Sequence, residues 1–253
     1  MNTNSNSYTI IYASVMVIIV AFLLAFVSSS LKETQNKNVE LDTKKQILSA
    51  LNITNVEDAE AAYNTYVKGD MLMEADGSLV ANNGAFNTTY KGEIAEGRLH
   101  VFECEVDGAK KYVIPVYGAG LWGPIWGYVA LNADKETIYG VYFSHAGETP
   151  GLGAEITNRD KFQVPFIGKK ALNADNEVVI SVVKNGKVQN PDTEVDGISG
   201  GTITSQGVDA MLKSSIGLYK EFLAEKACEK ACCAAVCDSV QCVPATEIQV
   251  VNQ

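Results

Sequence analysis

The segment that most constrains this chain is an apolar run near its N-terminus, from Tyr8 to Val27, with 20 residues and no charged side chain. An α-helix rises about 1.5 Å per residue, so the run is long enough to span a hydrocarbon core of roughly 30 Å. A cleaved signal peptide would carry a basic segment before a shorter apolar stretch, but MNTNSNS contains no Lys or Arg. We therefore predict a short tail at 1–7 and an uncleaved transmembrane anchor at 8–30.

The charges around the anchor bear on its orientation. Four lysines follow the run and none precedes it: Lys32, Lys37, Lys44 and Lys45. Because Lys and Arg are enriched on the cytoplasmic side of a membrane, this asymmetry favours a cytoplasmic body. Sequence physics alone leaves the topology open.

About 220 residues follow the anchor, enough for one large domain with a sizeable core. We expect this soluble domain at 31–226 and a cysteine-rich tail at 227–253, since five of the six cysteines lie between Cys228 and Cys242. The chain has 30 acidic and 20 basic side chains, a net charge of −10. This balance argues against nucleic-acid binding, because little would neutralise the phosphates.

The spacing of the tail cysteines fits neither zinc pairs nor ferredoxin runs, so disulfides or free thiols are favoured over a metal or iron–sulfur site. Cys104 lies in a predicted strand and is expected in the core. The sequence predicts no metal site, because His100 and His145 are the only histidines and neither has a cluster of ligands nearby.

The pattern of apolar residues predicts an α+β fold. The predicted helices are 41–51, 56–67 and 205–226, and the predicted strands are 98–106, 111–116, 125–131, 137–143 and 178–183. Hairpin turns are expected at Asp107–Gly108, at 132–135 and at Asn185–Gly186. Because the strands come in neighbouring pairs, we expect an antiparallel sheet with flanking helices.

The stretch from Asp196 to Ser205, DGISGGTITS, lies just before the predicted long helix. Small residues and hydroxyls at a helix N-terminus make an anion site, because free N–H groups and the helix dipole favour a phosphate there. Ordinary N-capping by Ser199, Thr202 or Ser205 is the alternative. Three glycines and four hydroxyls in ten residues exceed what a cap requires.

A second stretch, HAGETPGLGAE from His145 to Glu155, follows a predicted strand. Pro150–Gly151 predicts a tight turn and Gly153 removes another side chain, so the backbone could lie against a flat ligand. An ordinary turn is the alternative.

A third stretch, from Gly118 to Leu131, holds the only tryptophans, Trp122 and Trp126, among glycines. Aromatic side chains beside glycine turns suit stacking on a planar ring. A hairpin with its tryptophans in the core is the alternative.

Taken together, the three stretches resemble the family of FMN-binding C subunits of the Na⁺-translocating NADH:quinone reductases and, more distantly, the G subunit of the related Rnf complex. In that family the motif D-x-x-S/T-G-A-T carries FMN as a phosphoester on its last threonine. Here DGISGGT matches it from Asp196 to Thr202, with Gly201 in place of the usual alanine. The resemblance therefore implies covalent FMN on Thr202, with Thr204 as the second-choice hydroxyl. The GLWG run favours the reductase family over the Rnf protein.

The resemblance also implies which other residues contact the flavin. These are Ser199, Gly200 and Gly201 around the phosphate, the turn residues Glu148, Thr149, Gly151, Leu152 and Gly153 along the isoalloxazine, and Leu121 or Trp122 as an apolar neighbour. The implied function is a one-electron relay in a complex that oxidises NADH, reduces quinone and moves Na⁺. NADH would bind elsewhere in the complex, because the chain has no G-x-G-x-x-G or Walker A motif.

Further expectations come from the same resemblance. The partners would be the other subunits of the complex, a flavin transferase and membrane lipid. The family places the body on the periplasmic face of the inner membrane, against the lysine asymmetry. Two rival functions stay open: a membrane-anchored binding module without redox activity, and a structural subunit that has lost its flavin.

Overall fold

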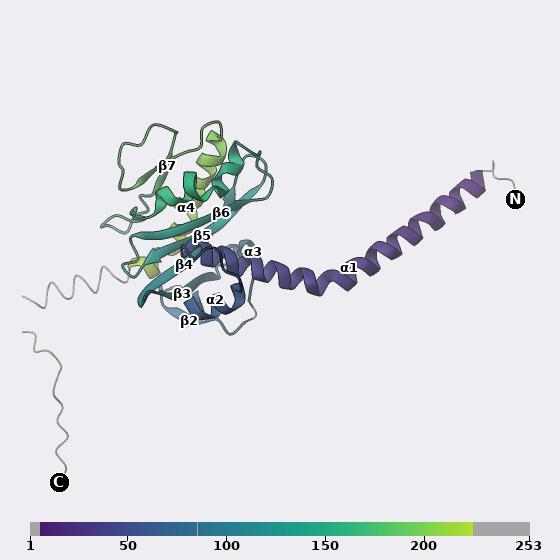
Figure 1. Ribbon diagram of the computed structural model, residues 1–253, viewed down its shortest axis with the longest axis horizontal. Helices are drawn as coiled ribbons and strands as arrows, with labels where there is room; N and C mark the ends of the chain where they lie inside the picture. The colour runs from purple at the N-terminus through teal and green to yellow at the C-terminus, as the bar shows by residue number, and fades with distance from the viewer. Residues whose placement is uncertain (1–5, 85, 225–253) are drawn as a thin grey trace, which may run out of the picture.

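The computed structural model describes residues 6–84 and 86–224 (Figure 1). A long helix, α1 (Asn6–Ala50), projects from a body built on an antiparallel sheet. The body continues with α2 (Ala59–Tyr66), β1 (Val67–Met73), β2 (Leu79–Ala81), α3 (Tyr90–Ala95), β3 (Leu99–Val106), β4 (Ala109–Ala119), β5 (Pro124–Asn132) and β6 (Ile138–His145). Short helical turns η1 (Gly153–Thr157), η2 (Arg159–Gln163) and η3 (Val164–Phe166) follow, then β7 (Ser181–Val183), β8 (Glu194–Asp196) and α4 (Thr202–Leu218). The predicted α+β class is confirmed.

Helix α1 joins two predicted elements, the apolar run and the helix at 41–51, into one helix of 45 residues. Its apolar part is long enough to cross a membrane, and none of that part is buried against the body. Burial begins at Thr43, and Ile47, Leu48 and Leu51 are enclosed. One continuous helix therefore ties the predicted anchor to the core.

The main sheet has the strand order β2-β1-β3-β4-β5-β6, and every neighbouring pair is antiparallel. The predicted turn at Asp107–Gly108 is confirmed, since both residues have positive φ, 52° and 73°. The predicted turn at 132–135 is also confirmed, with Lys135 at φ 55° between β5 and β6.

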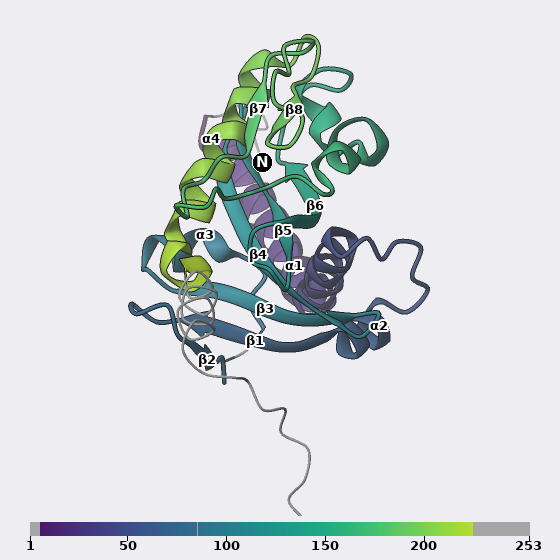
Figure 2. The ribbon, with the colours of Figure 1, turned by 90° about the vertical axis from the view of Figure 1, so that its left-hand side faces the viewer.

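The sheet has a hydrophobic cluster on each face, because side chains alternate along its strands. On β5, Ile125 and Val129 belong to the cluster under α4, whereas Tyr128 and Ala130 belong to the cluster under the end of α1. Figure 2 shows α4 and α1 on opposite sides of the sheet. Helix α4 lies close to β4, where a Cβ added to Gly118 would stand 2.7 Å from Met211 Cβ.

The predicted hairpin at Asn185–Gly186 is wrong. Strand β7 pairs with β8 in parallel, Val182 opposite Val195, and the polar segment 187–192 makes no strand between them. That segment lacks the alternating apolar residues of a returning strand. Asp209 on α4 also accepts the N–H of Val182, so the helix occupies a bond that a hairpin partner would use.

The observed bounds of other helices differ from the predicted ones. The helix predicted at 56–67 is shorter, because Asp58 caps α2 by accepting from the N–H groups of Glu60 and Ala61, and Val67 already begins β1. Helix α4 begins at Thr202, three residues before the predicted start, and ends at Leu218, with helix resuming at 220–224. Strands β1 and β2 and helix α3 were not predicted.

Candidate functional site

The three stretches singled out in the sequence meet at one end of the sheet. They are the tip between β4 and β5, the turn after β6, and the loop before α4. Antiparallel pairing of β5 with β6 brings the first two together, and the N–H of Ala146 donates to Pro124 O at 3.0 Å. Helix α4 packs on the end of β4, where Gly207 lies against the carbonyl of Ala119.

Glu148 links all three stretches through its side chain. Glu148 is 5 % exposed; its Oε1 accepts the backbone N–H of Trp122 at 2.8 Å, and its Oε2 accepts the hydroxyl of Thr204 at 2.6 Å. Its own N–H donates to His145 Nδ1 at 3.1 Å. The sequence predicted Glu148 along the flavin, whereas the structure places its carboxylate inside the protein, under the surface that these stretches form.

Two glycines make room for that carboxylate. A Cβ added to Gly120 would lie 2.4 Å from Glu148 Oε1, and one added to Gly153 would lie 2.4 Å from both Glu148 Oε2 and Thr204 Oγ1. Real Cβ atoms essentially never approach so closely. A side chain at either position would therefore have to displace the Glu148 carboxylate.

Helix α4 starts without a side-chain cap. Its N-cap is Gly201, and no side chain in the described part of the chain accepts from the first turn. Ser205 Oγ instead accepts the N–H of Ile198 and donates to Gly201 O. Capping by Ser199, Thr202 or Ser205 is therefore wrong, and the first-turn N–H groups keep their capacity to bind an anion.

The two candidate threonines differ in surroundings. Thr202 is the first residue of α4 and is exposed, whereas Thr204 is 1 % exposed and its hydroxyl is bonded to Glu148. A hollow of about 240 Å³ lies beside Thr202 and is lined in part by Gln206 and Asp209. A second hollow, of about 420 Å³, lies beside Ser199 and Gly151.

Large apolar side chains are exposed on the three stretches that meet at this end of the sheet. They are Leu121, Trp122, Leu152 and Ile203, and we call them the apolar collar. Trp122 is 69 % exposed, so a place in the core is wrong for it, whereas Trp126 is partly buried and its indole N–H donates to Gln46 on α1. The sequence analysis missed Ile203, although an apolar residue between two hydroxyl residues at a helix start was the available signal.

The turn after β6 has the predicted tight form. Thr149 O accepts the N–H groups of Leu152 and Ala154, and Gly151 has φ 75°. Gly200 (φ 79°) lies beneath Leu152, since a Cβ there would stand 2.7 Å from Leu152 Cδ2. The turn and the loop before α4 thus pack on each other.

Known proteins are similar to this chain in sequence and in fold. Residues 120–217 match the family model of the FMN-binding domain, so the match begins at Gly120 in the tip between β4 and β5 and ends within α4. The C subunit of the Na⁺-translocating NADH-quinone reductase of Haemophilus ducreyi is 32 % identical over 239 residues, covering 85 % of this chain and 91 % of that protein. The chain belongs to the C-subunit family of Na⁺-translocating NADH-quinone reductases. The resemblance seen in the sequence is therefore confirmed.

Two crystal structures from the C-subunit family share this fold. The Parabacteroides distasonis protein is 45 % identical, with a TM-score of 0.71 over 76 % of this chain and 96 % of that one. The Shewanella oneidensis NqrC is 26 % identical, with a TM-score of 0.63 over 76 % of this chain and 99 % of that one.

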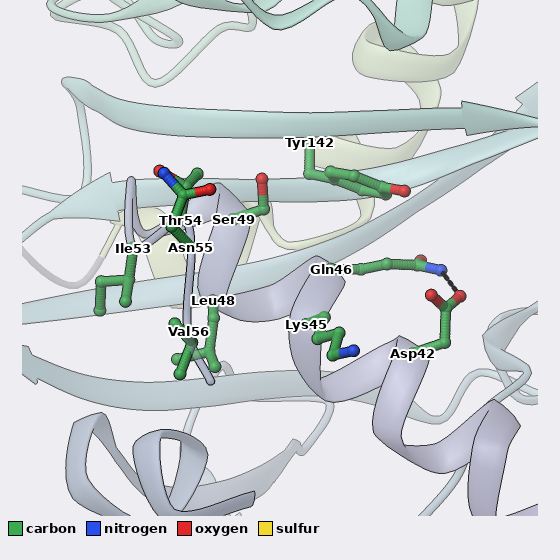
Figure 3. Close-up of a pocket in the computed structure, with 10 residues that line it drawn as sticks. All are labelled: Asp42, Lys45, Gln46, Leu48, Ser49, Ile53, Thr54, Asn55, Val56 and Tyr142. Atoms are coloured by element: carbon green, nitrogen blue, oxygen red, sulfur yellow. Dashed lines mark hydrogen bonds between the residues drawn. The ribbon is translucent and has the colours of Figure 1, made fainter. Parts of the chain in front are cut away.

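A separate pocket of about 310 Å³ lies where α1 meets the segment that follows it (Figure 3). Lys45, Ser49, Asn55 and Tyr142 are among its lining residues, and Gln46 donates to Asp42 at 2.7 Å on its rim. None of the residues predicted to hold the flavin lines this pocket.

The cysteines divide between the core and the tail. Cys104 is buried as predicted, and burial raises the pKa of its thiol to about 12. The cysteines from Cys228 to Cys242 lie outside the described residues. Within residues 6–84 and 86–224, no group of three His, Cys, Asp or Glu side chains is placed to hold a metal ion.

Proposed function

We propose that the chain carries FMN covalently on Thr202 and relays electrons within a membrane-embedded, Na⁺-translocating NADH-quinone reductase. The observation that carries this proposal is the start of α4, where an exposed hydroxyl stands on an uncapped helix N-terminus inside the apolar collar. Membership of the C-subunit family and the FMN-binding domain match support it.

Attachment would form one bond and break another. Thr202 Oγ1 would bond to the phosphorus of FMN, the bond from that phosphorus to the leaving group of the flavin donor would break, and the hydroxyl proton would pass to a base. A flavin transferase would bind the donor and provide that base. The exposure of Thr202 supports this assignment, whereas Thr204 is enclosed and its hydroxyl is already bonded to Glu148.

The loop before α4 would stabilise the phosphodiester. Its negative charge would face the first-turn N–H groups and the positive end of the helix dipole, which offsets the cost of adding an anion to a chain of net charge −10. Ser199, Gly200 and Gly201 add only small side chains around it. Backbone N–H groups would thus stabilise the charge of the phosphodiester in place of a lysine or arginine side chain.

The apolar collar would hold the ring system. Leu121 and Trp122 on the β4–β5 tip and Leu152 on the turn after β6 present exposed apolar surface, and the Glu148–Gly153 turn adds backbone groups. Bound FMN would supply the electron chemistry, while these residues exclude water and orient the ring. Neither NADH oxidation nor an acid–base side chain is assigned to this chain.

The membrane arrangement is a proposal of the same kind. We place α1 across the inner membrane as a single pass in contact with lipid, with the body on the periplasmic side beside the other subunits. The length and exposure of the apolar part of α1 support the span. An alkaline phosphatase fusion at the C-terminus tests the side: activity is expected, and an inactive fusion would place the body in the cytoplasm.

Fluorescence of the denatured chain tests the attachment. After electrophoresis in SDS, the wild-type band should fluoresce under ultraviolet light, and Thr202→Ala should abolish the signal. Thr204→Val is the matched control and should keep it. A band that loses flavin on denaturation would favour a non-covalent binding module, and full-length protein without flavin would favour a structural subunit.

A further inference from the structure

The side chain of Glu148 is buried where the three stretches meet, and the hydrogen-bond partners of its carboxylate are neutral groups. We propose that Glu148 is a positioning residue, which holds the β4–β5 tip against the first turn of α4 and places a negative charge that disfavours flavin reduction. This inference rests on the proposed function, since it names how that site is ordered and tuned.

The positioning role follows from the two hydrogen bonds. Each carboxylate oxygen accepts from a different stretch, the N–H of Trp122 at 2.8 Å and the hydroxyl of Thr204 at 2.6 Å. Trp122 lies on the exposed tip between β4 and β5. Within this tip, the N–H of Gly120 donates a backbone hydrogen bond to Gly123 O at 2.8 Å. The base of the tip packs on α4, where Gly207 lies against Ala119, and the carboxylate extends this attachment to Trp122.

The close approach of the glycines shows that the arrangement is tight. Gly120 and Gly153 stand on opposite oxygens of the carboxylate, and neither position has room for a Cβ. Gly201, the N-cap of α4, adds a third close approach, since a Cβ there would lie 3.3 Å from Gly153 N. Glu148 therefore has one place in the site, between the tip that carries Trp122 and the first turn of α4.

The electrostatic role follows from the absence of a cation. Across the described residues, no Lys, Arg or His side chain forms an ion pair with Glu148. Both oxygens act as acceptors, as in an ionised carboxylate. Its charge is offset only by hydrogen bonds and by the N-terminal end of α4, the same end that would hold the phosphodiester. A buried negative charge without a cationic partner would make adding an electron to a nearby flavin less favourable.

Glu148→Gln separates the charge from the contacts. An amide can accept from Trp122 N–H through its oxygen and donate to Thr204 Oγ1 through its nitrogen, so both bonds survive while the charge is lost. In the full-length flavoprotein, titrated spectroscopically in detergent, the midpoint potential should rise. The ratio of reduced to oxidised flavin at a fixed potential should increase on the order of tenfold, about 59 mV for one electron.

Glu136→Gln is the matched control, because Glu136 pairs with Lys170 at 2.9 Å in the turn between β5 and β6, away from the three stretches. Its midpoint potential should equal that of the wild type. An unchanged potential in Glu148→Gln would overturn the electrostatic role.

Positioning is tested without flavin, in full-length chains that carry Thr202→Ala. Adding Glu148→Ala should increase hydrogen–deuterium exchange at residues 120–123 and 202–205, while the strands β3 to β5 keep their protection. Unchanged exchange in both segments would overturn the positioning role. Wild-type protein free of covalent flavin would overturn the proposed function instead, and the exchange measurement would still decide the role of Glu148.

Discussion

Two clusters of buried polar side chains lie at the sheet, and the charged groups in them are stabilised by different kinds of partner. In the first cluster, Glu148 is held by the neutral donors Trp122 N–H and Thr204 Oγ1. In the second, His100 on β3 lies between two carboxylates, with Nδ1 2.8 Å from Asp70 and Nε2 2.5 Å from Glu93. His100 lies on β3 and Glu148 follows β6, and strands β4 and β5 lie between β3 and β6 in the sheet.

In the His100 cluster, the cost of burying charged groups is offset by charges of opposite sign. Burial by itself lowers the pKa of His100, but the hydrogen bonds and charges of Asp70 and Glu93 outweigh it and raise the pKa above its ordinary value of 6.5. A protonated ring donates at both nitrogens, which matches two carboxylate acceptors. Asn82 donates to Asp70 and Arg98 lies 3.6 Å from Glu93, so the network also joins residues around it.

The contrast indicates different tasks. The His100 cluster ties β1, β3 and α3 together with ion pairs, and bulky rings such as Tyr90 pack against it. The Glu148 cluster is surrounded by glycines, has no cationic partner among the described residues, and lies under the apolar collar. We interpret the first as a support of the fold and the second as the base of the proposed flavin site.

Removing the charge from each cluster should give the largest difference between them. His100→Gln removes the cation that lies between Asp70 and Glu93, and should lower the free energy of unfolding by about 2–3 kcal/mol. Glu148→Gln keeps both hydrogen bonds and should cost about 1 kcal/mol or less. Urea unfolding of both full-length variants in detergent measures this, and equal losses would contradict the contrast.

The next largest effect on stability is expected from filling the space around Glu148. Gly153→Ala pushes a methyl group against Glu148 and Thr204 and should cost about 2 kcal/mol, as overpacking does. Gly147→Ala is the matched control, because a Cβ there meets no atom within 4 Å, and should change stability by about 0.5 kcal/mol or less. Similar thermal unfolding of the two variants would show that the site is not tightly packed.

The pH dependence of stability should belong to the His100 cluster. Because the folded-state pKa is raised, the stabilisation by His100 is complete below its unfolded value of about 6.5 and is lost as pH rises through the folded value. The difference in unfolding free energy between wild type and His100→Gln should therefore shrink with rising pH. Asp70→Asn should flatten that dependence, and a difference that grows with pH would contradict the assignment.

The smallest effect on stability is expected at the collar. Trp122→Ala removes a largely exposed side chain and should change the unfolding free energy by about 0.5 kcal/mol or less, yet it should shift the visible spectrum of the bound flavin. Ile167→Ala, also at an exposed apolar residue, is the control and should change neither. An unaltered spectrum in Trp122→Ala would remove that side chain from the flavin environment.

The sequence predicted local features better than long-range ones. The turn at Asp107–Gly108 was predictable because it depends on two neighbouring residues with positive φ. Strand β1 was not, because its residues Lys68 to Met73 are mostly half-buried and show no alternation between two faces. Likewise, the failed hairpin at Asn185–Gly186 depends on Asp209, which the fold brings from α4.

The site shows the same division. Its three stretches were found in the sequence because each contains glycines, hydroxyls or tryptophans in an unusual local density. The role of Glu148 was not, because it joins Trp122 and Thr204 from opposite directions along the chain and only the tertiary fold brings them together. The exposure of Ile203 likewise depends on where α4 begins.

The mass of one tryptic peptide tests the central claim most directly. Cleavage after Lys187 and Lys213 releases residues 188–213, which contain both Thr202 and Thr204. From flavin-replete protein, this peptide should be heavier by one FMN less one water, and its fragment ions should place the addition between Gly201 and Ile203. An unmodified peptide, or fragments that place the flavin on Thr204, would contradict the account.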